Sequence, residues 1–525
     1  MKATELSDSA LATRASLALF VLGAWPLALT RVPPLQDLPN HLAAAHIIAH
    51  PEIYPEYLFN GFLKTNSALT AFLQWVGRAM GFEAAARLFV LGVVFVTAWA
   101  LPRFILRFAG RDRVVVASLL GWPMVHNWFV SMGMLNFALA FPLSLLVLIA
   151  LDRQRVAPSV RGGFVIAALS LVTWYAHAFP LCVVAGLVAL HAATRATWAA
   201  RIRDARALLL PLAPTGALLV VSALAHFVKP AEGPPRPSGV VTHRLHDLAL
   251  NLWYDFFAGF TWLSAASIVP AILLPFFAWR RWRESPPFFS PLASVALVLA
   301  YVELPFAASN WWYFNSRLIP FVWLTMLLRV PPALPRPVSR LLVACAACYG
   351  VAMGVDYVRL DRDRVAFTAG IDAVPDRARL LPLIFEPRRT SDFTSSLEHA
   401  WGFYVLAKNT SAPLVFAVER SYPITYRVFP PAQLVPPALD GFARSARSAA
   451  AVCSDLLREG VASIDCDAEW RARWAGFWSE AEPRFDHVLM WAAPSGVRAL
   501  VPSRYAIAFE SGELVIYARS EARVP

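Results

Sequence analysis

Residues 134–151 read MLNFALAFPLSLLVLIAL, a run of 18 residues without a charged side chain. A helix of this length and apolarity is long enough to cross the hydrocarbon core of a bilayer. Comparable runs recur along the chain at residues 15–31, 84–106, 114–130, 163–180, 181–195, 207–227, 260–279, 288–306, 312–328 and 339–356. Together they predict eleven transmembrane helices. The run at residues 67–76 is too short to span and predicts an interfacial or re-entrant helix.

Composition supports an α-helical polytopic membrane protein. The chain of 525 residues is 58% hydrophobic and 16% charged, whereas soluble domains are about 25% charged. A net charge of +12 could indicate a nucleic-acid partner. However, residues 1–356 hold 27 Lys and Arg against 15 Asp and Glu, while residues 357–525 hold 20 of each. The excess therefore lies in the membrane half, which favours a positive-inside bias and argues against nucleic acid.

The basic residues also predict the orientation. With the N-terminus inside, 19 basic residues of residues 1–356 fall in inner loops and 8 in outer loops. Counting residues 67–80 as a span would reverse this bias. We therefore expect a retained first helix with a cytoplasmic N-terminus and a transmembrane domain over residues 1–356. Its long outer-face loops are residues 32–83 and 228–259.

Residues 357–525 predict an extracytoplasmic α/β domain. Strand-like runs occur at LVFAVE (414–419) and HVLMWA (487–492), and residues 505–518 resemble a hairpin turning at Glu-Ser-Gly. Cys453 and Cys466 could form a disulfide if this segment lies outside the cytoplasm.

Polar chemistry collects on the predicted outer face, which holds ten of the eleven histidines. There the stretch PPLQDLPNHL (33–42) carries Asp37, Asn40 and His41. Asp37 can be a helix N-cap, with Pro39 in the first turn, or part of a catalytic centre. His46 and His50 have the i,i+4 spacing of zinc-binding pairs, but without an HExxH pattern a zinc site is disfavoured.

Other outer-face residues are candidates for a substrate pocket because ionisable groups at membrane depth are costly and tend to be functional. They are His126, Asn127, His177, Glu303, Trp311, Trp312, Arg317, His399 and Tyr404. The two tryptophans also fit an interfacial aromatic belt. Arg317 is the one arginine between two apolar runs on this side, which predicts that it faces a cavity or an anionic partner.

This arrangement resembles the bacterial membrane glycosyltransferases of the GT-C fold, a superfamily that includes mannosyl- and arabinosyltransferases. These enzymes use polyprenyl-phosphate-linked sugars. The shared features are a first helix with its N-terminus inside, a large first outer loop carrying an early acid, about eleven to thirteen spans and an extracytoplasmic C-terminal domain. The family often has two adjacent acids in that loop, whereas this chain has Gln36 followed by Asp37.

The resemblance implies a bacterial cytoplasmic membrane enzyme that moves a sugar from a polyprenyl-phosphate donor to a lipid, glycan or protein acceptor. It implies that Asp37 is the catalytic base or a ligand of a divalent ion, Mg²⁺ or Mn²⁺. On this hypothesis His41 assists Asp37, Asn40 lies in the substrate site and Arg317 binds the departing phosphate. A direct displacement would invert the anomeric centre.

Three other functions remain open. A transporter or lipid flippase would suit eleven spans, but it predicts an internal repeat and paired charges near the bilayer midplane, and the sequence suggests neither. A lipid-linked transferase that moves a group other than a sugar could use the same outer face. A membrane scaffold or sensor would not depend on Asp37.

Overall fold

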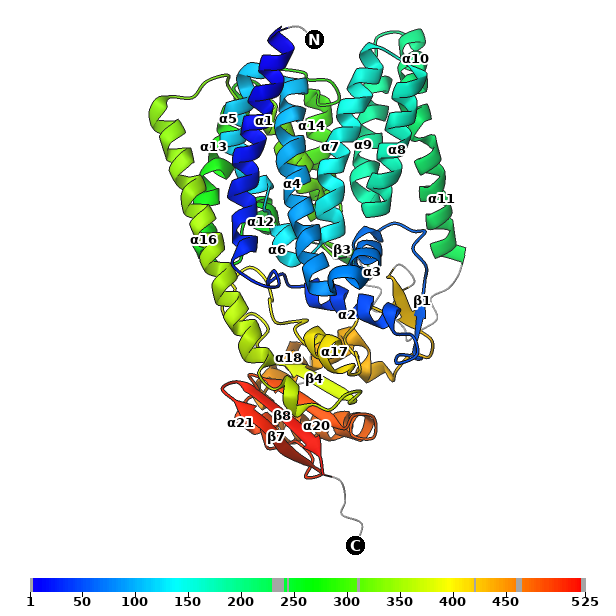
Figure 1. The fold of residues 1–525 in the computed structure, drawn as a ribbon, viewed down its shortest axis with the longest axis vertical. Coiled ribbons are helices and arrows are strands. Elements are labelled where there is room, and N and C mark those ends of the chain that lie inside the picture. Colours follow the sequence, from blue (N-terminus) through cyan, green and yellow to red (C-terminus); the bar gives the residue numbers. More distant parts are fainter. Residues whose placement is uncertain are drawn as a thin grey trace.

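The computed structural model describes residues 3–228, 240–242, 245–308, 312–419, 422–458 and 465–520. Helices dominate it and many run side by side along its long axis (Figure 1). Within the described residues, seven segments are long and apolar enough to cross a membrane: Ser7–Ala28, Phe82–Ala109, Arg111–Met132, Leu135–Val156, Trp198–Ser222, Trp262–Trp279 and Arg336–Ala373. They overlap the helices α1 (Ala3–Ala24), α4 (Phe82–Ala109), α5 (Val114–Gly121), α6 (Trp128–Met132), α7 (Leu135–Val156), α10 (Trp198–Leu209), α11 (Ala213–Val228), α13 (Ile268–Trp279) and α16 (Arg336–Thr368).

Four further predicted spans coincide with shorter apolar helices. These are α8 (Val160–Ala176), α9 (Ala178–Ala193), α14 (Pro291–Glu303) and the segment Ser316–Leu327, which contains α15 (Ile319–Leu327). At 10–17 residues they lie at or below the length of about 17–25 residues that a span needs. A polytopic helical membrane protein is thus supported, while the count of eleven spans stays a prediction.

Helix α4 shows why these sequences form membrane helices. It is apolar on every side, burying Val90 and Val94 in the bundle while Leu88 and Phe95 stay exposed on its outer surface. A helix with apolar residues all round needs an apolar environment on its outer face as well. The bilayer supplies that environment for exposed leucine and phenylalanine side chains.

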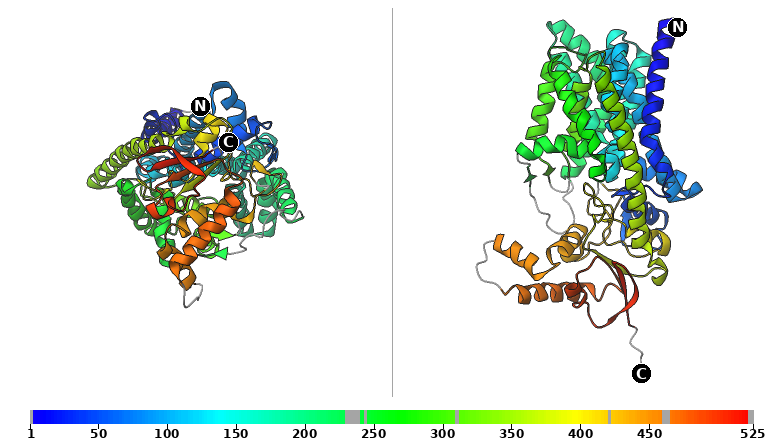
Figure 2. Two further views of the ribbon diagram at one scale, coloured as in Figure 1. Left: turned by 90° about the horizontal axis from the view of Figure 1, so that it is seen from below. Right: turned by 90° about the vertical axis from the view of Figure 1, so that its left-hand side faces the viewer.

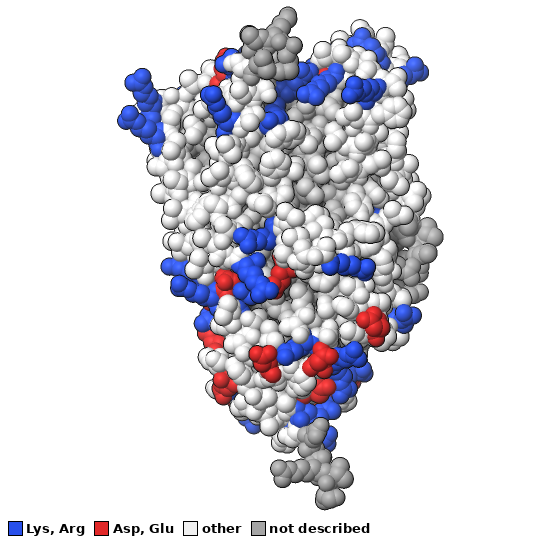
Figure 3. Space-filling view, viewed as in Figure 1, with Lys and Arg blue, Asp and Glu red and all other residues white. Residues whose placement is uncertain are grey.

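Charged side chains mark the two ends of the bundle. Figure 3 shows basic residues at the end that carries the N-terminus, then a broad band almost free of charge, then mixed charges toward the C-terminal segment. At the first end Arg113 pairs with Glu284 at 2.6 Å and Arg111 with Asp8 at 3.2 Å. The loops that the sequence assigns to one side of the membrane therefore meet at one end of the bundle.

The opposite end is built from the first long loop and the C-terminal segment, far from the N-terminus (Figure 2). Helix α2 (Leu38–Ala49) and the amphipathic helix α3 (Ala68–Met80) lie here, whereas α12 (Leu245–Phe257) packs against α6 and α13 in the bundle. The short run at residues 67–76 is indeed a helix of 13 residues. The Asn136 side chain holds its start by accepting a hydrogen bond from Leu69 N at 2.9 Å. Most of the loop predicted at residues 228–259 is helix α12 or lies outside the described residues.

The C-terminal segment contains a four-stranded mixed sheet in the order β4-β6-β8-β7. Its strands are β4 (Leu380–Ile384), β6 (His487–Trp491), β7 (Tyr505–Ser511) and β8 (Leu514–Arg519). The helices around it include α17 (Gly402–Lys408), α18 (Pro436–Ser445), α19 (Ala449–Arg458) and α20 (Cys466–Ala481). The hairpin predicted at residues 505–518 is confirmed, with Gly512 at φ +58° in its turn. The predicted division at residue 356 falls inside α16, which continues to Thr368.

The strand predicted at residues 414–419 is wrong. This segment is irregular and lies over the start of α2, because Leu414 O and Phe416 N bond to the Asn40 side chain instead of a strand. A short strand in the first loop, β1 (Tyr57–Phe59), instead pairs antiparallel with β5 (Ile424–Tyr426). The loop after α1 and the C-terminal segment therefore form one folded unit at this end of the bundle.

Candidate functional site

Asp37 occupies the N-cap position of α2, as the sequence predicts, but its side chain accepts no hydrogen bond from the first turn of that helix in the described structure. Its carboxylate instead pairs with His399, with Oδ1 3.5 Å from Nε2. The two side chains are 17% and 5% exposed. No other described side chain is recorded within hydrogen-bond distance of this carboxylate, so its second oxygen, Oδ2, is available to a ligand.

His399 has both ring nitrogens engaged. Asn40 Nδ2 lies 3.4 Å from Nδ1 and also donates to Leu414 O at 3.2 Å, while Asn40 Oδ1 accepts from Phe416 N at 3.1 Å. Because the Asn40 amide is oriented by two backbone groups, Nδ1 is the acceptor and Nε2 carries the proton toward Asp37. His399 therefore positions Asp37 and has no free nitrogen with which to take a proton from a substrate.

The surroundings of His399 are acidic. Burial lowers the pKa of His399, but Asp37 and then Glu398 and Asp440 outweigh it, so the pKa is raised overall. Burial raises the pKa of Asp440 to about 7, against a weaker opposing effect of His399. Asp37 thus sits in a cluster of titratable groups supplied by both ends of the chain, an arrangement common at functional sites.

His41 lies beside this pair with its ring 6.3 Å from that of Phe416. Burial lowers its pKa despite the attraction of Asp37, and His399 lowers it further. The partner within ion-pair distance of Asp37 is His399, and not His41.

Two glycines bring the backbone of this stretch into close contact on both sides. Gly133 ends α6 at φ +85°, and a Cβ there would lie 2.8 Å from Asp37 N. The turn it makes lets Met132 O accept the hydrogen bond of Asp37 N at 2.9 Å. From the other side, a Cβ on Gly402 would lie 2.3 Å from Pro39 O. Asp37 is therefore fixed between the membrane bundle and the C-terminal segment.

Arg317 is 7% exposed and has no acidic partner in the described structure. Its Nη1 donates to Trp312 O at 2.8 Å and to Tyr313 O at 3.3 Å, and its buried Nε–H has no partner among the described residues. It lies within electrostatic reach of His177 and Tyr422. Tyr313 is in turn within electrostatic reach of Asp37. A buried guanidinium with a free N–H fits an anionic ligand.

The other predicted pocket residues have structural contacts or lie apart. His126 contacts Gly23 O and Tyr357, Asn127 caps α6, and the Tyr404 hydroxyl donates to Phe367 O. Glu303 is exposed at the end of α14. Trp312 is 54% exposed. Trp311 lies outside the described residues, and His177 caps α9 next to Arg317.

Metal binding does not fit the donors near Asp37. Both nitrogens of His399 are occupied, and no group of three or more His, Cys, Asp or Glu in the described part of the chain could hold a metal ion. The His46 and His50 rings contact each other at 4.5 Å, but His46 bonds Asn409 and His50 lies near Glu52.

Several residues near Asp37 were not predicted. Gln36 donates to Glu398 at 3.3 Å and accepts from Ser395 N at 2.6 Å, which joins the Asp37 loop to the C-terminal segment. Arg444 lies 3.9 Å from Glu398. Asp440 and Arg444 stand four residues apart on α18, a spacing that places them on one face, but nothing in the sequence indicates which face meets the membrane bundle.

Neither the scan against protein-family models nor the search of curated proteins found a match for this chain.

Proposed function

We propose that the chain is an integral membrane glycosyltransferase of the GT-C type. It would transfer a sugar from a polyprenyl-phosphate donor to an acceptor hydroxyl on the outer face of the bacterial cytoplasmic membrane. The observation that carries the proposal is the Asp37 carboxylate. It has no capping role, is oriented through Oδ1 by His399, and keeps Oδ2 free at the junction of the bundle and the C-terminal segment.

The proposed reaction needs a base and an anion-binding group. Asp37 Oδ2 takes the proton of the acceptor hydroxyl as its oxygen attacks the anomeric carbon, and the bond from that carbon to the phosphate oxygen breaks. The donor leaves as polyprenyl phosphate, whose negative charge Arg317 stabilises through its free Nε–H. This displacement inverts the anomeric centre and uses no covalent enzyme intermediate.

The disulfide between Cys453 and Cys466 supports an extracytoplasmic C-terminal segment, because disulfides persist in oxidising compartments. The basic residues at the opposite end of the bundle agree with a cytoplasmic N-terminus. Reporter fusions at residues 110, 200 and 400 test this orientation, and a cytoplasmic signal at residue 400 would contradict it.

The deciding experiment is Asp37→Asn, with lipid-linked sugars and surface glycans profiled by mass spectrometry. Because Asp37 makes no cap hydrogen bond, we expect transfer to be lost while the unfolding temperature changes little. If Asp37 served only as a helix cap, transfer would continue, since Asn caps as well as Asp. A flippase or a scaffold also predicts an unchanged transfer product, so a wild-type glycan profile would reject the proposed function.

A further inference from the structure

An arginine-lined cavity of about 780 Å³ opens in the C-terminal segment. Its walls are the loop after β4, the end of α18 and one side of α19 along its length. The lining includes Arg388, Arg444, Arg447 and Arg458 but only two acids, Glu386 and Asp455. The volume lies within the range of about 300–1,000 Å³ typical of ligand sites.

The arginines differ in how they are neutralised. Arg458 pairs with Asp455, and Arg444 lies 3.9 Å from Glu398. Arg388 and Arg447 make no ion pair or side-chain hydrogen bond in the described structure and are exposed to the cavity. Two guanidinium groups therefore remain free to bind carboxylate or phosphate in the bidentate geometry that arginine favours.

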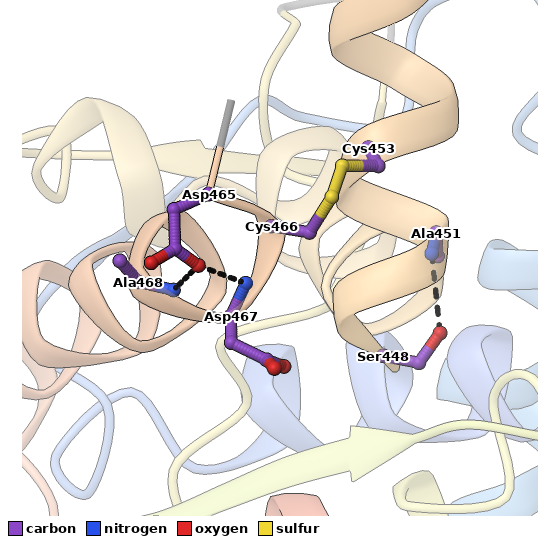
Figure 4. Close-up of a disulfide and its surroundings, with 7 residues drawn as sticks. All are labelled: Ser448, Ala451, Cys453, Asp465, Cys466, Asp467 and Ala468. Carbon is purple, nitrogen blue, oxygen red and sulfur yellow. Dashed lines mark hydrogen bonds between the residues drawn. A yellow bond between two sulfur atoms is a disulfide. The ribbon is translucent and has the colours of Figure 1, made fainter. Parts of the chain in front are cut away.

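The remaining lining adds hydroxyl groups and a helix end. Ser395, Ser445, Ser448 and Ser454 line the cavity. Ser448 also caps α19 by accepting from Ala451 N at 3.1 Å, so the positive end of this ten-residue helix opens onto the same space (Figure 4). The Cys453–Cys466 disulfide ties α19 to the start of α20 and holds this wall in place.

The cavity is connected directly to the Asp37 loop. Its lining residue Ser395 donates its backbone N–H to Gln36 Oε1 at 2.6 Å, and Gln36 precedes Asp37. Another lining residue, Arg444, contacts Glu398, which accepts from Gln36 Nε2. Gln36 and Glu398 therefore link the cavity wall to the loop that carries the proposed base.

We propose that this cavity binds an acidic oligosaccharide, with sugars bearing carboxylate or phosphate groups, and presents its end to Asp37 as the acceptor. Free guanidinium groups recognise the anionic substituents, and serine hydroxyls together with a helix end suit a polar, hydroxyl-rich ligand better than a lipid chain. The identity of this ligand as acceptor rests on the proposed transferase function, whereas its binding does not.

The test is a titration of the full-length protein in detergent by isothermal calorimetry. The probes are tetragalacturonate, a singly phosphorylated mannotetraose and neutral maltotetraose. We expect at least one acidic probe to bind and the neutral probe not to bind, and the acidic probe that binds identifies the carboxylate or phosphate chemistry. Arg388→Gln with Arg447→Gln should weaken that binding about tenfold or more, because each removes a charge-assisted hydrogen bond.

The matched control is Arg471→Gln with Arg484→Gln. It removes the same two charges from exposed residues of the same segment that do not line the cavity. Equal binding of acidic and neutral probes, or an equal loss in both double variants, overturns the proposal. Asp37→Asn should bind the acidic probe as wild type does. If it does so while neither the wild type nor any variant shows sugar transfer, the cavity assignment stands and the transferase function fails.

Discussion

Gly402 provides a sharp test of how the site is assembled, because it marks the closest approach of α17 to α2. In Gly402→Ala the new Cβ would lie 2.3 Å from Pro39 O and 2.8 Å from Pro39 C, both backbone atoms that cannot rotate away. Ordinary contact begins at 3.4 Å, so the two helices must separate by about 1 Å.

The cost follows from this displacement. Overpacking of this kind costs about 1–3 kcal/mol. The same movement shifts His399, whose carbonyl accepts from Gly402 N at 2.9 Å. The Asp37–His399 pair, already 3.5 Å apart, would then be broken. A misplacement of about 1 Å at a reacting group can lower a rate by about 100-fold.

The assay is thermal unfolding of purified Gly402→Ala in detergent, followed by measurement of sugar transfer. Gly476→Ala is the matched control, since Gly476 lies within α20 with nothing near the added Cβ. Replacing a helical glycine in open space should stabilise by about 0.5–1 kcal/mol. If Gly402→Ala unfolds at or above the temperature of Gly476→Ala, the close approach of α17 and α2 is refuted.

Two further predictions concern the C-terminal segment. Partial burial raises the pKa of Asp440 to about 7, above its ordinary value, so the folded state loses stability as pH rises toward and through 7. Asp440→Asn should therefore unfold at a higher temperature than wild type at about pH 8, and the gain should shrink as pH falls toward 5; a gain that does not change with pH would contradict this. Replacing both Cys453 and Cys466 by Ser should lower the free energy of unfolding of this segment by about 2–4 kcal/mol in denaturant titrations, because their disulfide closes a loop of sequence separation 13. The double variant should unfold as the reduced wild-type protein does. A difference between these two proteins would show another role for the cysteines.

The helical bundle was predictable because bilayer thickness and hydropathy act on each segment separately. Each of the eleven apolar runs lies on an apolar helix, and the short run at residues 67–76 is helix α3. Periodicity also gave the hairpin of β7 and β8. The strand prediction failed at residues 414–419, where a continuous apolar run packs over α2 and forms no strand.

The site was predictable only in part, because its partners are set by tertiary contacts. The sequence indicated Asp37, Asn40 and His399 as separate candidates, and the structure brings these three together. The sequence did not distinguish these three candidates from His126 and Tyr404, whose polar atoms are used in packing. A local sequence pattern indicates that a polar residue lies near a helix end. It does not indicate which of the many such residues meet at one junction in the folded chain.

The sequence separation across the site has a consequence for biogenesis. Asn40 and His399 are 359 residues apart, so at about 5–20 residues per second the ribosome needs roughly 20–70 s to make the second after the first. During that interval the loop that carries Asp37 has no Gly402, His399 or β5 to pack against. The contacts that hold Asp37 and Asn40 therefore form only after the C-terminal segment has been made, so unfinished chains carry no assembled site.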